Sequence, residues 1–119
     1  MSIRTERVAS LIREELGTTL SREFSGSREY GFTTVTEVRV TPDLRTARVF
    51  VSIMGSAEKQ EKTMAQIEKL KGHYRSELGQ KINLKFVPVI EFRHDKSLDN
   101  AMHIESLIKQ IHKDDKKEE

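Results

Sequence analysis

The chain has 119 residues, of which 35% are hydrophobic and 34% charged, and its formal net charge is +2. This size fits one domain with a modest core and a strongly solvated surface. The absence of cysteine excludes a disulfide framework, a thiolate zinc site and a cysteine nucleophile. Because no stretch approaches the roughly 18 apolar residues of a membrane span and the N-terminal segment lacks a signal-peptide core, we expect a cytoplasmic protein that does not bind a membrane.

The N-terminal segment predicts an amphipathic helix from about Thr5 to Arg22. Its apolar residues recur at steps of three and four and are separated by charged residues, which is the pattern of a helix with one buried side. These apolar residues are Val8, Leu11, Ile12, Leu16 and Leu20. The segment SGSREYGF that follows contains two glycines and two serines and is typical of a loop.

Residues 34–54 change to a period of two, which is typical of strands with one buried face. The apolar residues that alternate with polar ones are Val38 and Val40, then Ala47, Val49, Val51 and Ile53. Between the two runs lies TPDLR, where Pro42 and Asp43 favour a turn. The segment therefore predicts a β-hairpin that packs one face on the core.

A second helix is predicted to begin at Ser56 and to be broken near Gly72. Its buried stripe comprises Met64, Ile67 and Leu70 and resumes with Tyr74, Leu78 and Ile82. A glycine inside a helix costs about 1 kcal/mol relative to alanine. We therefore interpret Gly72 as a kink between two half-helices.

A third strand is predicted for LKFVPVIEF, residues 84–92. We expect Phe86, Ile90 and Phe92 on one face, and Val87, Val89 and Arg93 on the other. Because Pro88 cannot donate a ladder hydrogen bond, this strand should lie at a sheet edge or carry a bulge.

The C-terminal region predicts a last amphipathic helix followed by a tail. The helix would bury Leu98, Ala101, Ile104, Leu107, Ile108 and Ile111, and the closing KDDKKEE is typical of disorder. We therefore expect a domain over residues 1–95, an amphipathic helix over 96–112 that packs on the domain or on a partner, and a disordered tail over 113–119.

The order of elements predicts an α+β domain with a three-stranded sheet. A strand–helix–strand crossover is nearly always right-handed, so the broken helix and the first helix should cover the same face. The other face would then carry Phe50, Met54, Val87 and Val89. We expect the C-terminal helix or a partner to cover these apolar residues.

The phrases VTEVRVTPDLRTARVFVS, ELGQKINLKFVPVIEF and HDKS, with this order of elements, resemble the bacterial ribosome-binding factor A family over roughly residues 3–108. The resemblance implies a type II KH-like fold, α-β-β-α(kink)α-β with a mixed sheet, plus a C-terminal helical extension. It also implies a non-enzymatic assembly factor that binds the small (30S) ribosomal subunit, assists late maturation and processing of 16S rRNA and supports growth in the cold. The family's Ala-x-Gly kink corresponds to Leu70, Lys71 and Gly72, so leucine replaces the alanine.

The predicted RNA-binding site surrounds Gly72. Residues 69–85 contain five cations, Lys69, Lys71, Arg75, Lys81 and Lys85, and one acid, Glu77. Lysine and arginine bind a phosphate backbone largely through counterion release, and such contacts position a protein rather than read bases. Arg45 and Arg48, at the hairpin, are second-rank candidates. When only the charges are considered, dipole partners and solubilising charge explain such a cluster about equally well.

Other functions have weaker support in the sequence. The four histidines do not form a metal-ligand spacing, and neither a nucleotide-binding glycine loop nor a GxSxG elbow is present, so we expect no metal, no cofactor and no enzymatic activity. The alternative is a protein-binding adaptor that uses the open sheet face and the last helix. Ribosomal proteins are possible partners beside the RNA, and a monomer is expected.

Overall fold

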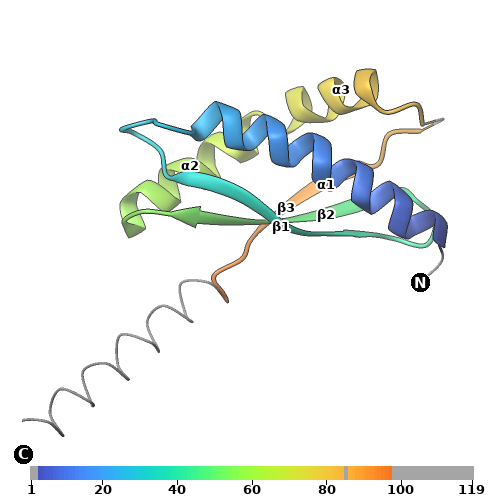
Figure 1. Ribbon diagram of the computed structural model, residues 1–119, viewed down its shortest axis with the longest axis horizontal. Coiled ribbons are helices and arrows are strands. Elements are labelled where there is room, and N and C mark those ends of the chain that lie inside the picture. The colour runs from blue at the N-terminus through green and yellow to red at the C-terminus, as the bar shows by residue number, and fades with distance from the viewer. Residues whose placement is uncertain (1–2, 85, 98–119) are drawn as a thin grey trace, which may run out of the picture.

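The computed structural model describes residues 3–84 and 86–97 (Figure 1). The elements, in chain order, are α1 Ile3–Phe24, β1 Phe32–Val40, β2 Thr46–Met54, α2 Ala57–Lys69, α3 Lys71–Lys81 and β3 Val89–His94. The three helices lie on one side of a single three-stranded sheet (Figure 1). The predicted α+β order is confirmed, whereas the predicted C-terminal helix and tail lie outside the described residues, apart from Lys96 and Ser97.

β2 is the central strand of the sheet. It pairs antiparallel with β1 and parallel with β3, in the order β1-β2-β3. A parallel pair requires a crossover connection, which α2 and α3 supply. The ladder between β1 and β2 shifts register between Val35 and Glu37, so Thr36 is the extra residue of a bulge. Its hydroxyl donates to Asp95 Oδ2 at 2.8 Å, which ties the chain after β3 to β1.

The core lies between the helices and the inner sheet face. Its members are Val8, Ile12, Leu16, Leu20 and Phe24 of α1, Val35 and Val40 of β1, Ala47, Val49, Val51 and Ile53 of β2, Ile67 of α2, Tyr74 and Leu78 of α3, Ile82 directly after α3, and Ile90 and Phe92 of β3. The predicted stripes are therefore confirmed for most positions. Leu11 is an exception, with 45% of its surface exposed, because the buried line of α1 runs through positions four apart and leaves Leu11 at its side.

The start of the third strand was predicted wrongly. β3 begins at Val89, where its N–H donates to Arg45 O at 2.8 Å, so residues before Pro88 do not pair with β2. Phe86 was expected to point inward but is 76% exposed. Pro88 lies immediately before an edge strand, as its missing N–H requires.

The outer face of the sheet is more polar than the sequence pattern indicated. Arg48 lies 3.2 Å from Glu91 and Arg93 lies 3.6 Å from the same carboxylate, while the guanidinium of Arg39 covers the ring of Phe50 at 5.4 Å. Val87 was expected on this face but is partly buried against the helical layer. Within residues 3–84 and 86–97, no helix combines the length and apolarity that a bilayer span requires.

Two glycines are required by close packing, and this requirement can be tested. A Cβ at Gly31 would collide with the backbone oxygen of Met54, and one at Gly79 would lie 2.9 Å from Val87 Cγ2. Gly31→Ala and Gly79→Ala should each lower the free energy of unfolding by about 1–3 kcal/mol, because overpacking displaces neighbours. Urea denaturation measures this change.

Gly72→Ala is the matched control, because no atom lies within 4 Å of a Cβ placed there. It should leave the free energy of unfolding unchanged or raise it by up to about 1 kcal/mol, since alanine is the better helix former. Equal loss of stability in all three variants would contradict this description of the packing.

Candidate nucleic-acid interface

The break between α2 and α3 is confined to one residue. Leu70 is at once the last cap of α2 and the first cap of α3, with φ −95° and ψ 8°. Its N–H donates to Gln66 O and its carbonyl accepts from Tyr74 N, both at 3.0 Å. The bend expected at Gly72 therefore lies two residues earlier, and Gly72 does not use a positive φ.

Tyr74 anchors α3 to the rest of the domain. Its side chain is completely buried, and its ring meets the edge of Phe92 with centroids 6.0 Å apart. The hydroxyl donates to Glu23 Oε2 at 2.9 Å, at the end of α1. Burial, followed by the neighbouring Glu23 carboxylate, raises the pKa of Tyr74 above its ordinary value, so the phenol keeps its proton. This anchor fixes the orientation of the residues at the start of α3.

The start of α3 departs from the usual preferences of a helix N-terminus. Leu70 makes no side-chain capping bond, no acid lies in the first turn, Lys71 is the first residue and Gly72 the second. Cations at this end oppose the helix dipole by about 0.3–1 kcal/mol each. By contrast, α2 is capped by Ser56, whose hydroxyl accepts from Lys59 N, and carries Glu58 in its first turn. Local departures of this kind concentrate at functional sites.

Gly72 lies on the surface, and its surroundings do not explain its presence. A Cβ there would meet open space, and the backbone conformation does not require glycine. Where a helix start has no side chain, an outside partner can come closer to the backbone N–H groups. The position is therefore suited to the close approach of an anion.

Of the predicted cations, three flank the break between α2 and α3. Lys69 is exposed at the end of α2, and Lys71 Nζ lies 3.3 Å from Glu68 Oε2. Arg75 follows Lys71 by one helical turn, and its guanidinium donates to Val87 O at 2.8 Å and to Pro88 O at 3.2 Å. We name Lys69, Lys71, Gly72 and Arg75 the kink surface.

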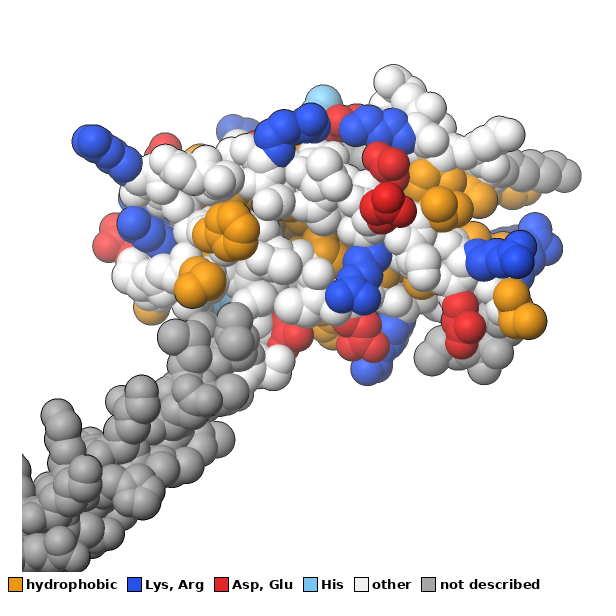
Figure 2. Space-filling model, viewed as in Figure 1, with side chains coloured by type: hydrophobic (Ala, Val, Ile, Leu, Met, Phe, Trp, Pro, Cys, Tyr) orange, Lys and Arg blue, Asp and Glu red, His pale blue; other side chains and the backbone are white. Residues whose placement is uncertain are grey.

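The other predicted cations do not belong to the kink surface. Lys81 lies 3.3 Å from Glu77 and 3.8 Å from Glu15, and so connects α3 to α1. Arg48 lies on the outer sheet face beside Glu91, and Lys85 falls outside the described residues. The acids Glu68 and Glu15 were overlooked: Glu68 directly precedes the basic segment, whereas Glu15 is distant in sequence. Figure 2 accordingly shows acidic side chains among the basic ones on the face in view.

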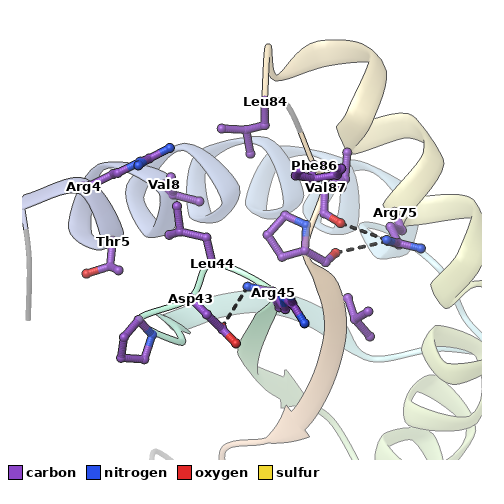
Figure 3. Close-up of a pocket in the computed structure, with 13 residues that line it drawn as sticks. Arg4, Thr5, Val8, Asp43, Leu44, Arg45, Arg75, Leu84, Phe86 and Val87 are labelled. Carbon is purple, nitrogen blue, oxygen red and sulfur yellow. Dashed lines mark hydrogen bonds between the residues drawn. The ribbon is translucent and has the colours of Figure 1, made fainter.

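Arg45 and Arg75 both line a pocket that could not be identified from the sequence. The pocket, of about 690 Å³, lies between the first turn of α1, the β1–β2 turn and the segment before β3 (Figure 3). Arg4 is a third arginine in its lining. In the sequence, Arg4 could have been singled out only by its place at the start of a predicted helix, where the helix dipole disfavours a cation.

The element order and the mixed sheet covered on one side define a KH-like α+β domain. The fold is similar to the crystal structure of ribosome-binding factor A from Thermus thermophilus, with a TM-score of 0.63, 14% identity, and 76% of this chain and 94% of that one covered. It is also similar to the solution structure of a Thermotoga maritima protein provisionally described as ribosome binding factor A, with a TM-score of 0.65, 26% identity, and 82% and 92% covered.

A third similar structure is a homology model of the Thermus thermophilus factor fitted into a cryo-EM map of its complex with the 30S subunit. That match has a TM-score of 0.57 and 17% identity, and covers 72% of this chain and 93% of that one. The sequence model of ribosome-binding factor A matches residues 4–108. The chain belongs to the ribosome-binding factor A family.

The contacts of Arg75 predict a structural cost that Lys71 does not share. Arg75→Ala removes two charge-assisted hydrogen bonds to the segment before β3 and should lower the free energy of unfolding by about 1–3 kcal/mol. Lys71→Ala removes only an exposed pair with Glu68 and should change stability by less than about 0.5 kcal/mol. Urea denaturation of both variants checks this difference, and equal effects would contradict it.

Proposed function

We propose that this chain is a non-enzymatic assembly factor that binds the small ribosomal subunit through its kink surface, chiefly against 16S rRNA. The observation that carries the proposal is the start of α3, where Lys71 and Gly72 occupy positions that a stable helix gives to acids and better helix formers. An external phosphate would offset this local cost. The 30S complex of the Thermus thermophilus factor supports the choice of partner.

The kink surface would bind the phosphate backbone rather than read its bases. Positive charge comes from Lys69, Lys71 and Arg75. The open position at Gly72 allows the phosphate backbone of the RNA to approach the start of α3. Each phosphate contact contributes about −0.7 to −0.9 to the slope of log affinity against log salt. Three contacts therefore predict a slope of roughly −2 to −3 from this surface alone.

Binding of this kind supplies free energy and no chemistry. A factor that binds one conformation of an RNA better than another shifts the RNA toward the first. We propose that the conformation favoured here is one from which late maturation and processing of 16S rRNA proceed, and that the factor matters most in the cold. The protein would act in the cytoplasm as a monomer.

Charge reversal at the kink surface tests the proposal. Lys69→Glu with Lys71→Glu should weaken co-sedimentation with purified small subunits by about tenfold or more, because two phosphate contacts become repulsive. The unfolding midpoint should change little, because a glutamate at position 71 suits the dipole of α3 and offsets the glutamate at position 69, which opposes the dipole at the end of α2. Arg75 is left intact because it also holds the segment before β3.

The matched control is Lys59→Glu with Lys62→Glu, which makes the same change of charge on α2 but near its start. This variant should retain most of the affinity for the subunit. Equal losses in the two double variants would indicate a response to net charge and overturn the assigned surface. Binding that persists unchanged at high potassium chloride would instead favour the protein-binding adaptor.

A further inference from the structure

The pocket near the kink surface is lined by four separate parts of the chain. α1 contributes Arg4 and Val8, the β1–β2 turn contributes Leu44 and Arg45, and α3 contributes Arg75, while Leu84 and residues 86–89 line the other side (Figure 3). Its volume of about 690 Å³ lies within the range of roughly 300–1,000 Å³ that small-molecule sites occupy. It is therefore large enough to hold a nucleotide.

The walls of the pocket are largely apolar and include an exposed aromatic ring. Phe86 is 76% exposed, and Val89, which also lines the pocket, is half exposed. Leu44 adopts a left-handed backbone with φ 61°, a conformation that costs a non-glycine residue about 1 kcal/mol or more, and its side chain points into the space between α1 and the turn (Figure 3). An apolar cavity with an aromatic edge suits a flat ring.

The charged lining is net positive. The lining contains three arginines, Arg4, Arg45 and Arg75, and one acid, Asp43. The Thr41 hydroxyl, followed by the Arg45 N–H, hydrogen-bonds Asp43 Oδ1 and holds the pKa of this carboxyl below its ordinary value. Asp43 is thus already bonded within its own turn. Three arginines from three parts of the chain therefore line a largely apolar cavity.

We propose that this pocket takes one unstacked nucleotide of a single-stranded RNA, with the base against Phe86 and the flanking phosphates beside Arg45 and Arg4. The inference rests on the proposed function. Arg75 belongs to both the kink surface and the pocket lining, so one RNA strand can follow from the first to the second. Unpaired bases stack on aromatic side chains with about 1–3 kcal/mol each.

A nucleotide fits this lining better than a protein segment does. An acidic side chain could pair with the arginines, but it has no flat ring for Phe86, and an apolar side chain leaves the positive charge of the lining without a counter-charge. A nucleotide combines an apolar, planar base with an adjoining anion. The chemistry of the pocket therefore matches both parts of one ligand.

Two probes separate base contacts from charge contacts. The first is a fluorescent, unstructured single-stranded oligoribonucleotide of about 12 residues, within the site sizes of small single-strand-binding folds. The second is inorganic polyphosphate, which has the charge but no bases. Binding of both is measured, by anisotropy and by competition, for Phe86→Ala, Arg45→Gln, the Lys69→Glu with Lys71→Glu double variant, and Met54→Ala.

Phe86→Ala should weaken oligoribonucleotide binding about fivefold to one hundredfold and leave polyphosphate binding unchanged. Arg45→Gln should weaken both, and the hydrogen bonds that link residue 45 to Asp43 and Val89 survive because they use its backbone atoms. Met54→Ala, which removes another exposed apolar side chain, should have no effect. Photocross-linking of a 4-thiouridine-substituted oligoribonucleotide should reach Phe86 or Leu44.

Unchanged oligoribonucleotide binding by Phe86→Ala, together with weaker binding by the double lysine variant, would overturn the pocket and leave the proposed function standing. Unchanged binding by every variant, in RNA and small-subunit assays alike, would overturn both. If Phe86→Ala weakened binding to the small subunit but not to protein-free RNA, the pocket would take a ribosomal protein instead, and the nucleotide proposal would fail.

Discussion

The burial of Tyr74 is the constraint on which the candidate interface depends. Its ring packs in the core and its hydroxyl bonds Glu23, so α3 cannot rotate about its axis without losing both contacts. The break at Leu70 then leaves Lys71 and Gly72 on the outside, one turn from Arg75. The position of these groups follows from the core and not from their own interactions, and the domain can therefore present an unfavourable helix start to a partner.

The sequence predicted the parts of the fold that periodicity controls. The stripe of α1, the hairpin and the two half-helices were expected because buried residues recur at periods of 3.6 and 2. The start of β3 could not be predicted, because Phe86 and Val87 continue an apolar pattern while the pairing with β2 begins only after Pro88. The break was predicted at Gly72 because glycine is a poor helix former, but it lies two residues earlier, at Leu70.

The candidate site was less predictable than the fold, because charge depends on tertiary neighbours. Counting cations along the sequence could not reveal that Lys81 lies near Glu15. Nor could it show that Arg48 lies beside Glu91 on the sheet face that the helices do not cover. It also could not reveal that Arg75 holds two carbonyl groups before β3. Arg4 escaped notice because only the folded chain brings the start of α1 to the β1–β2 turn.

Association of Gly72→Ala with purified small ribosomal subunits tests the central claim most directly. The added methyl group meets no atom of the protein itself, so any loss of binding reports on the partner's approach and not on misfolding. If the open helix start is the place where RNA phosphates meet the chain, the variant should be as stable as the native protein and should bind the subunit more weakly. Native affinity in a stable Gly72→Ala protein would contradict the account.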